Sequence, residues 1–418
     1  MPTASRVQQI MKLDSVLLRK ILNFFILVFI GACPFSIALS QSALFIGLAL
    51  SVCIMLWEKR SSVPRSPLDL YFLAYMVVGI NSMIFSGEKG MVVIFVKRLS
   101  LIPIVYLILG NVTSKRFLTA VFGLLAGVMV VLSLIGIRKY LVGVRGLEGR
   151  LELFHHYMTS GGILMMLSLI AFSFAILGTP LKWKVIAFTS GLLMVFALLF
   201  TFTRSSWLGF LAGFLVIAIA HSKKALLGVG MILVLFWLTA SPSLKDRASS
   251  IFNPYHRHNI ERLYMWKAGI QIIKDHPLGG VGDVDLKEWY ERYKPPEAKQ
   301  RAGHLHDNLI MFGVTLGVPG LLFFVALSLK LLIMEWKILR SVPKEEWLLK
   351  GTVLGALASY LGFQVNGLFE WNFGDAEIAM LLWLTVGLAL SAQKIAACAL
   401  SPGTELPQGD CFESCACS

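Results

Sequence analysis

Twelve continuous apolar runs dominate the sequence, each near the roughly twenty residues that an α-helix needs to cross a bilayer. Because these runs do not alternate polar and apolar residues, they predict helices and not the strands of a barrel. Only 15% of the residues are charged, where a soluble domain carries about a quarter. We therefore predict an all-α polytopic membrane protein with about twelve transmembrane helices, at residues 21–40, 42–57, 68–85, 91–110, 117–137, 159–178, 184–202, 206–221, 225–241, 309–329, 351–370 and 376–394.

Two long connections separate some of these runs, at residues 138–158 and 242–308. The second shows helical periodicity from Arg262 to Lys274 and then a glycine-rich turn, so we expect a partly helical cap. The apolar face expected on that helix consists of Leu263, Trp266, Ile270 and Ile273. The predicted division of the chain is 1–241 with nine spans and short loops, 242–308 as one large loop, 309–395 with three spans, and 396–418 as a disordered tail.

Basic residues between the spans lie mostly on one side of the predicted membrane. If the spans alternate in direction, the short loops of the other side carry only Lys89 and Arg204. The positive-inside rule then places both termini in the cytoplasm and both long connections on the outer side. The net charge of +14 therefore reflects topology in part, and it does not indicate a nucleic-acid partner. The cations that remain on the outer side favour an anionic partner.

Two outer arginines are candidate ligands for an anion. Arg204 joins two apolar runs almost without a loop, where it opposes the usual charge bias. We favour a ligand role over an arginine that reaches for lipid headgroups, because a guanidinium binds phosphate in a bidentate fork. Arg262 opens the predicted loop helix and is either a solvated side chain or a second contact in the same cavity.

Other charged residues have open roles. Lys97 and Arg98 lie about two turns inside a predicted span, so they need a counter-anion. That anion is either a bound phosphate or a carboxylate such as Glu370 or Asp375. The turn from Glu370 to Asp375, with Asn372 inside it, holds either helix caps or contacts for an acceptor hydroxyl.

The connection 138–158 carries a further cluster of cations and histidines, including Arg145, Arg150 and His156. Outward positive charge beside a membrane indicates an anionic ligand, and the headgroups of membrane lipids would satisfy it equally. The sequence leaves these two alternatives open.

Residues 301–308 read Arg-Ala-Gly-His-Leu-His-Asp-Asn directly before an apolar run. Imidazole titrates nearest neutral pH, so His304 and His306 at the mouth of a membrane helix suggest proton transfer. Asp307 and Asn308 adjoin them and would orient a ring. A His-x-His pair with an aspartate is also metal-ligand chemistry, but the pattern supplies no third strong ligand, so we predict no metal there.

Three motifs, in this order along the chain, resemble those of the O-antigen ligase and polymerase superfamily. The resemblance covers roughly residues 145–395. That family commonly shows His-x-His-Asn, whereas Asp307 holds the asparagine position here. The motifs are Thr203-Arg204-Ser205-Ser206-Trp207-Leu208-Gly209; Arg262 and Trp266 with His276-Pro277-Leu278-Gly279-Gly280-Val281-Gly282; and His304-Leu305-His306-Asp307-Asn308 with Gly317 and Gly320.

The resemblance implies a GT-C-like membrane glycosyltransferase that needs no metal or other cofactor. Its donor would be a glycan on undecaprenyl diphosphate, its acceptor lipid A-core, and its place the periplasmic face of the bacterial inner membrane. The resemblance carries the role of general base to His306 and diphosphate binding to Arg204 and Arg262.

O-antigen polymerase and protein O-oligosaccharyltransferase, of the same superfamily, remain alternatives. A secondary transporter or flippase for an anionic substrate is the alternative from another class. It would show repeat symmetry between the two halves of the chain, which we do not find in the sequence.

Overall fold

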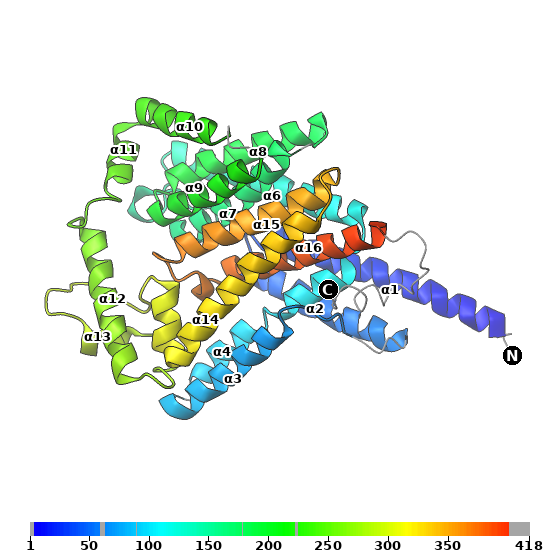
Figure 1. The fold of residues 1–418 in the computed structure, drawn as a ribbon, viewed down its shortest axis with the longest axis horizontal. Coiled ribbons are helices and arrows are strands. Elements are labelled where there is room, and N and C mark those ends of the chain that lie inside the picture. Colours follow the sequence, from blue (N-terminus) through cyan, green and yellow to red (C-terminus); the bar gives the residue numbers. More distant parts are fainter. Residues whose placement is uncertain (1–3, 59–62, 89, 178, 222–224, 401–418) are drawn as a thin grey trace.

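The computed structural model describes residues 4–58, 63–88, 90–177, 179–221 and 225–400. Every regular element among them is a helix, as predicted, and most of the long helices run side by side in a bundle (Figure 1). In chain order the helices are α1 (Ala4–Ala32), α2 (Ile37–Trp57), α3 (Asp69–Ser86), α4 (Met91–Leu99), α5 (Pro103–Asn111), α6 (Lys115–Leu141), η1 (Leu147–Gly149), α7 (Tyr157–Ile176), α8 (Leu181–Phe200), α9 (Arg204–His221), α10 (Ala225–Thr239), α11 (Pro242–Ser249), α12 (Arg257–Asp275), α13 (Lys287–Tyr293), α14 (Asn308–Ser341), α15 (Trp347–Asn366), η2 (Asn372–Gly374) and α16 (Ala376–Leu400).

The lengths and compositions of the helices match a polytopic membrane protein. Within the described residues, nine helices are long and apolar enough to cross a membrane, if α4 and α5 count as one. The other predicted spans also form helices, α1, α9 and α10, of which α9 and α10 contain shorter apolar segments. All twelve predicted spans are therefore helical, although length and composition alone support nine of them.

Several predicted boundaries differ from those of the helices, and three of the differences have a local cause. The span expected at 21–40 is interrupted, because α1 ends at Ala32 and Pro34 follows before α2 begins. The span expected at 91–110 breaks before Pro103, which occupies the first turn of α5, where its missing N–H leaves no hydrogen bond unmade. The tail expected from residue 396 begins too early, because α16 continues through good helix formers to Leu400. Residues 401–418 lie outside the described residues.

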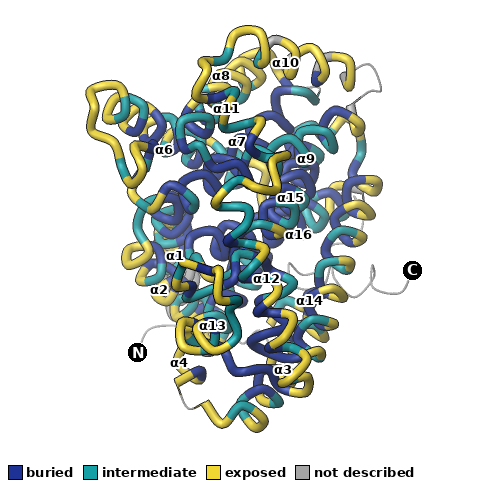
Figure 2. Tube along the Cα trace, turned by 90° about the vertical axis from the view of Figure 1, so that its left-hand side faces the viewer, coloured by how far each residue is buried: buried dark blue, intermediate teal, exposed yellow. Residues whose placement is uncertain are grey.

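Burial separates inner from outer helices. In the most apolar stretch of α7, 94% of the residues are buried, and in that of α16 89%, whereas in α3 the share is 17%. Figure 2 shows buried residues gathered around α7, α15 and α16, with exposed residues on the outer helices. The exposed outer residues include large apolar ones such as Leu70 and Ile84 of α3, both more than 70% exposed. An apolar outer surface of this kind suits contact with lipid.

Small residues bring α9 against α15. A Cβ at Gly209 would lie 2.6 Å from the carbonyl oxygen of Gly362, and one at Gly213 would lie 2.5 Å from that of Ala358. Glycines four residues apart let the backbones of membrane helices approach closely. Because α9 begins at Arg204, this contact also sets where that arginine lies.

The glycine-rich turn after α12 docks onto a break in α14. Gly317 interrupts α14 with a φ of 69°, and Gly280 in the turn has a φ of 66°. The turn donates the N–H of Val281 to the carbonyl oxygen of Val314 at 2.8 Å, and Val318 donates back to Pro277 at 2.8 Å. Two motifs that are far apart in the sequence therefore form one joint, which fixes the large loop to the bundle.

The predicted helix in the large loop is present as α12, but of its predicted apolar face only Trp266 and Ile273 pack against the core. Leu263 and Ile270 are 42% and 49% exposed. The buried face instead contains Met265, Ala268, Gly269 and Ile272. The reason is steric, because a Cβ at Gly269 would lie only 2.4 Å from the side chain of Ile310. The small residues allow the close approach to α14, and they decide which face turns inward.

We expect Gly280→Ala to destabilise the protein by about 2–4 kcal/mol, because a side chain there combines a left-handed backbone with overpacking. A Cβ at this position would lie 2.4 Å from the carbonyl oxygen of Val314. Thermal unfolding of the purified protein in detergent measures the change. Gly127→Ala in α6 is the control, because nothing lies within 4 Å of its Cβ position. Equal unfolding midpoints for the two variants would contradict the prediction that this contact between the turn and α14 stabilises the protein.

Candidate functional site

The main candidate residues come together at one end of the bundle. We call it the loop end; it carries α11, α12 and α13, and it lies opposite the N-terminal end of α1 (Figure 1). The turn between α15 and α16 belongs to the same end, because Asn308 at the start of α14 donates its N–H to the carbonyl oxygen of Gly367 at 2.7 Å.

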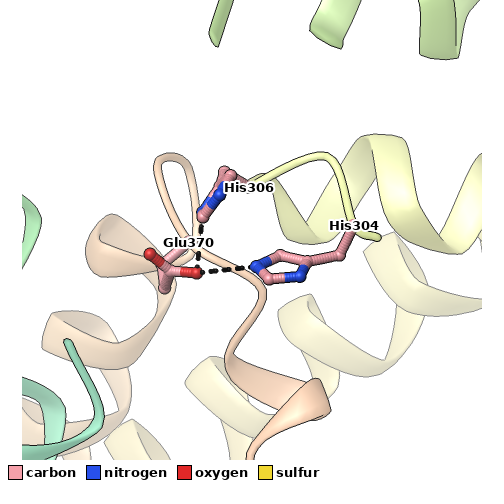
Figure 3. A group of neighbouring side chains, drawn as sticks. All are labelled: His304, His306 and Glu370. Atoms are coloured by element: carbon pink, nitrogen blue, oxygen red, sulfur yellow. Dashed lines mark hydrogen bonds and ion pairs between the residues drawn. The ribbon is translucent and has the colours of Figure 1, made fainter. Parts of the chain in front are cut away.

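His306 and His304 both face one carboxylate. The Nδ1 of His306 lies 2.9 Å from Oε1 of Glu370, and the Nε2 of His304 lies 3.4 Å from the same oxygen (Figure 3). His306 has a φ of 51°, in the left-handed region that residues with a side chain seldom adopt. The next residue, Asp307, caps α14 by accepting the N–H of Ile310 at 2.8 Å. The left-handed backbone is that of His306, whose side chain contacts Glu370. The next residue, Asp307, starts α14.

Glu370 is the shared partner at the centre of the site. Its Oε1 also accepts the N–H of Trp371 at 3.1 Å, and its Oε2 lies 3.9 Å from a terminal nitrogen of Arg262. Burial alone would raise the pKa of Glu370, but His306 and His304 hold that pKa well below its usual value. The carboxylate is therefore ionised at neutral pH and joins the histidine pair to Arg262.

The pKa values of the two histidines are shifted in opposite directions. Burial lowers the pKa of His306, and the opposing effect of Glu370 does not restore it to the ordinary value. Burial also lowers the pKa of His304, but there the hydrogen bond and charge of Glu370 outweigh it and the pKa rises. Because Nδ1 of His306 faces the carboxylate, we assign the proton to Nδ1, which leaves Nε2 with a free lone pair. Such an imidazole can accept a proton from a hydroxyl.

Arg204 is buried and held by neutral groups. Its guanidinium donates to the carbonyl oxygen of Ser250 at 2.8 Å and to Oδ1 of Asn259 at 2.7 Å. Phe202, two residues earlier, has a φ of 52°, which marks the sharp turn into α9. No carboxylate of the described residues pairs with Arg204, so its charge is available to an anion.

Arg204 and Arg262 are part of a larger group of arginines. Burial, together with the charges of Arg150 and Arg204, lowers the pKa of Arg247 to about 10. Arg150 forms an ion pair with Glu148 and lies 4.1 Å from the ring centre of Tyr157. We call these four residues, Arg150, Arg204, Arg247 and Arg262, the arginine cluster. Among the described residues, two carboxylates pair with members of the cluster, Glu148 with Arg150 and Glu370 with Arg262, so the four arginines keep a net positive charge.

Sequence reasoning missed Arg247. It lies in α11, in a polar stretch that resembles an ordinary linker. The only signal in the sequence was the positive charge of Arg247, which adds one more cation to the predicted outer side, like Arg204. Arg150, from the connection 138–158, does reach the cluster, whereas Arg145 is exposed and stacks on Tyr140 at 4.7 Å.

Arg98 has a structural partner that the sequence did not indicate. It donates to Oδ1 of Asp283 at 2.9 Å and to the carbonyl oxygen of Phe373 at 2.8 Å. Neither Glu370 nor Asp375 pairs with it, so both predicted counter-anions are wrong. The neighbouring Lys97 is exposed. The pair Arg98–Asp283 ties α4 to the turn after α12.

The remaining candidates near the site act as supports. Asn308 accepts the N–H of Asn372 at 3.0 Å, and Asn372 donates its side-chain amide to Phe363 at 2.8 Å. Asp375 accepts the hydroxyl of Thr159 at 2.7 Å, and burial raises its pKa to about 6.

His156 is also a support, because its Nδ1 accepts the N–H of Met158 at 3.3 Å and caps α7. The caps and backbone contacts of these residues hold the two turns that carry His306 and Glu370.

Glu370 lies beside the two histidines as a third potential metal ligand, which the sequence pattern did not indicate. One ligand atom each of His304, His306 and Glu370 lies within 4.8 Å of the others. Two imidazoles and a carboxylate also form the ligand set of some zinc enzymes. Glu370 also lies within hydrogen-bonding distance of His306 and within ion-pair distance of His304.

Residues 189–325 match the family model described as O-antigen ligase (Wzy_C). No curated protein matches the sequence. The matched segment contains Arg204, Arg262, His304 and His306, and Glu370 lies beyond it. Residues 189–325 of the chain are therefore similar to the O-antigen ligase family.

Proposed function

We propose that the protein is an O-antigen ligase that transfers polysaccharide from undecaprenyl diphosphate to lipid A-core. The reaction takes place at the loop end, which faces the periplasm at the bacterial inner membrane. The similarity of residues 189–325 to the O-antigen ligase family supports transfer of a glycosyl group by a membrane protein. The finer proposal depends on the residues gathered at the loop end.

The arginine cluster is suited to the diphosphate of the donor. A guanidinium stays charged at neutral pH and offers two parallel N–H donors to two phosphate oxygens. The net positive charge of the cluster would be neutralised by a diphosphate, and the same charge would stabilise that group as it leaves. The lipid chain of the donor would stay in the bilayer beside the apolar outer helices.

His306 is suited to activate the acceptor. Its Nε2 removes the proton from a sugar hydroxyl of lipid A-core, while Glu370 holds Nδ1–H and stabilises the imidazolium that forms. The alkoxide oxygen attacks the anomeric carbon of the donor glycan. A new C–O bond forms there as the bond from that carbon to the diphosphate oxygen breaks, and the arginine cluster receives the departing diphosphate. Direct displacement inverts the configuration of the anomeric carbon.

The observation that carries the proposal is the shared carboxylate of Glu370. It lies 2.9 Å from His306 and 3.9 Å from Arg262, so one buried group connects the base to the arginine cluster. A base and an anion site that are this close can act on the two sides of one glycosidic bond.

Other activities of the superfamily would use the same site. An O-antigen polymerase would lengthen a lipid-linked chain, and a protein O-oligosaccharyltransferase would glycosylate a protein; the product distinguishes them. A transporter of an anionic substrate places its site near the middle of the membrane between two repeats. The cluster here lies at one end of the bundle, which favours an enzyme.

We expect His306→Ala to lower the rate of transfer about 10²–10⁴-fold, because it removes the general base. The assay uses purified protein in detergent with a lipid-linked glycan donor and lipid A-core, and it detects the joined product. His156→Asn is the control, because it replaces another imidazole of the loop end and keeps a capping side chain. Near-normal turnover of His306→Ala would remove the base from this mechanism.

We expect Glu370→Gln to lower kcat by more than about tenfold and to move the acidic limb of the pH–rate profile to lower pH. The carboxylate raises the pKa of His306 against the larger effect of burial, so its removal lowers that pKa further. Below its pKa the imidazole is protonated and cannot act as a base, and the rate falls there. Profiles of kcat for wild type and variant measure both effects. An unchanged profile would show that Glu370 does not act on the base.

We expect transfer to persist in excess EDTA, because the proposed steps need only the imidazole and the arginine cluster. The assay above is repeated after chelation and after addition of Zn²⁺, Mg²⁺ or Mn²⁺. Loss of activity in EDTA that one of these ions restores would instead assign His304, His306 and Glu370 to a metal site.

A further inference from the structure

The short helix α11 and the turn before α9 hold each other through two arginines. Arg247 in α11 donates its Nε–H to the carbonyl oxygen of Phe202 at 2.9 Å. Arg204 donates in return to the carbonyl oxygen of Ser250, at the end of α11, at 2.8 Å. The hydroxyl of Ser250 also donates to the carbonyl oxygen of Arg247 at 2.7 Å. These reciprocal contacts fix both guanidinium groups at one place in the site.

The two arginines use different parts of their guanidinium groups. Arg204 uses one terminal nitrogen for the carbonyl and hydroxyl of Ser250 and the other for Asn259. Arg247 uses only its Nε. Across the described residues, the two terminal nitrogens of Arg247 have no hydrogen-bond acceptor or carboxylate. These are the two nitrogens that bind a pair of phosphate oxygens end-on.

The charge around Arg247 also requires an anion. Glu148 pairs with Arg150 and Glu370 faces Arg262, whereas no described carboxylate pairs with Arg204 or Arg247. Burial and the charges of Arg150 and Arg204 lower the pKa of Arg247 to about 10, so it remains protonated at neutral pH. Like charges held together in a half-buried site are unfavourable unless an anion binds between them.

We propose that Arg247 is a further diphosphate-binding residue, whose two free terminal nitrogens grip the phosphate oxygens of the donor. Arg204 then has two tasks: it adds charge, and it holds α11 so that Arg247 points into the site. The identification of the anion as a diphosphate rests on the proposed function. The short helix α11, which resembles a linker in the sequence, becomes a wall of the donor site.

The test uses the purified full-length chain in detergent and inorganic pyrophosphate as the probe, with affinity measured by titration calorimetry. We expect Arg247→Gln to weaken pyrophosphate binding at least tenfold and to raise the KM for the lipid-linked donor by a similar factor, with a smaller change in kcat. Lys245→Gln is the matched control, because it removes one cation from the same helix, two residues away and hence from another face. We expect its affinity to stay within twofold of wild type.

A second variant separates the phosphate contact from the anchoring of α11. In Arg247→Lys the ammonium keeps the charge and can still donate to Phe202, but it lacks the fork. We expect it to unfold at the wild-type temperature and to bind pyrophosphate more weakly than wild type. Wild-type affinity in Arg247→Gln or in Arg247→Lys would overturn the proposal, and so would a wild-type protein that does not bind pyrophosphate.

The two proposals fail in different ways. Pyrophosphate binding is measured without any glycan, so it does not depend on the transfer reaction. A wild-type protein that binds pyrophosphate through Arg247 but transfers no glycan would contradict the ligase function and support the anion site.

Discussion

The candidate site depends on one buried carboxylate. Glu370 contacts His306, His304 and Arg262 at once, and each contact is stronger when the carboxylate is ionised. A buried carboxylate without partners would become neutral, because burial penalises the charged form. Here the imidazoles and the arginine supply the compensation, so Glu370 stays charged and orients the group that we propose as the base. Without Glu370, no single side chain would contact both the proposed base, His306, and Arg262 of the arginine cluster.

The same logic of charge explains why the site lies at the end of the bundle. Four arginines with two facing carboxylates would be very unfavourable in the hydrocarbon core. At the loop end the four arginines come from the connection before α7 and from α9, α11 and α12, and they are buried or half-buried there. Their residual positive charge is then a driving force for binding an anion. The structural pair of Arg98 with Asp283 shows the other solution, in which a cation near the same end is neutralised within the protein.

Much of the fold could be predicted, because the apolar runs and the helical stripe of the large loop are local patterns. The boundaries were less certain: Pro34 and Pro103 break spans that hydropathy joined, and α16 extends past its predicted end. The buried face of α12 could not be predicted from periodicity, because Gly269 and Ala268 turn inward only where Ile310 of another helix approaches. The partner of Arg98 was missed for the same kind of reason, since Asp283 lies 185 residues away in the chain.

By itself the sequence determined that this is a helical membrane protein, and its motifs singled out His306, Arg204 and Arg262. These conclusions follow from length, hydropathy and short local patterns, which do not require knowledge of contacts. Only the tertiary structure decided that Glu370 is the shared partner of the histidines, that Arg150 and Arg247 join the other two arginines, and that Arg98 does not. Such choices depend on which side chains meet across α4, α11, α12 and the turn after α15, and distances across the fold are not written in any local pattern.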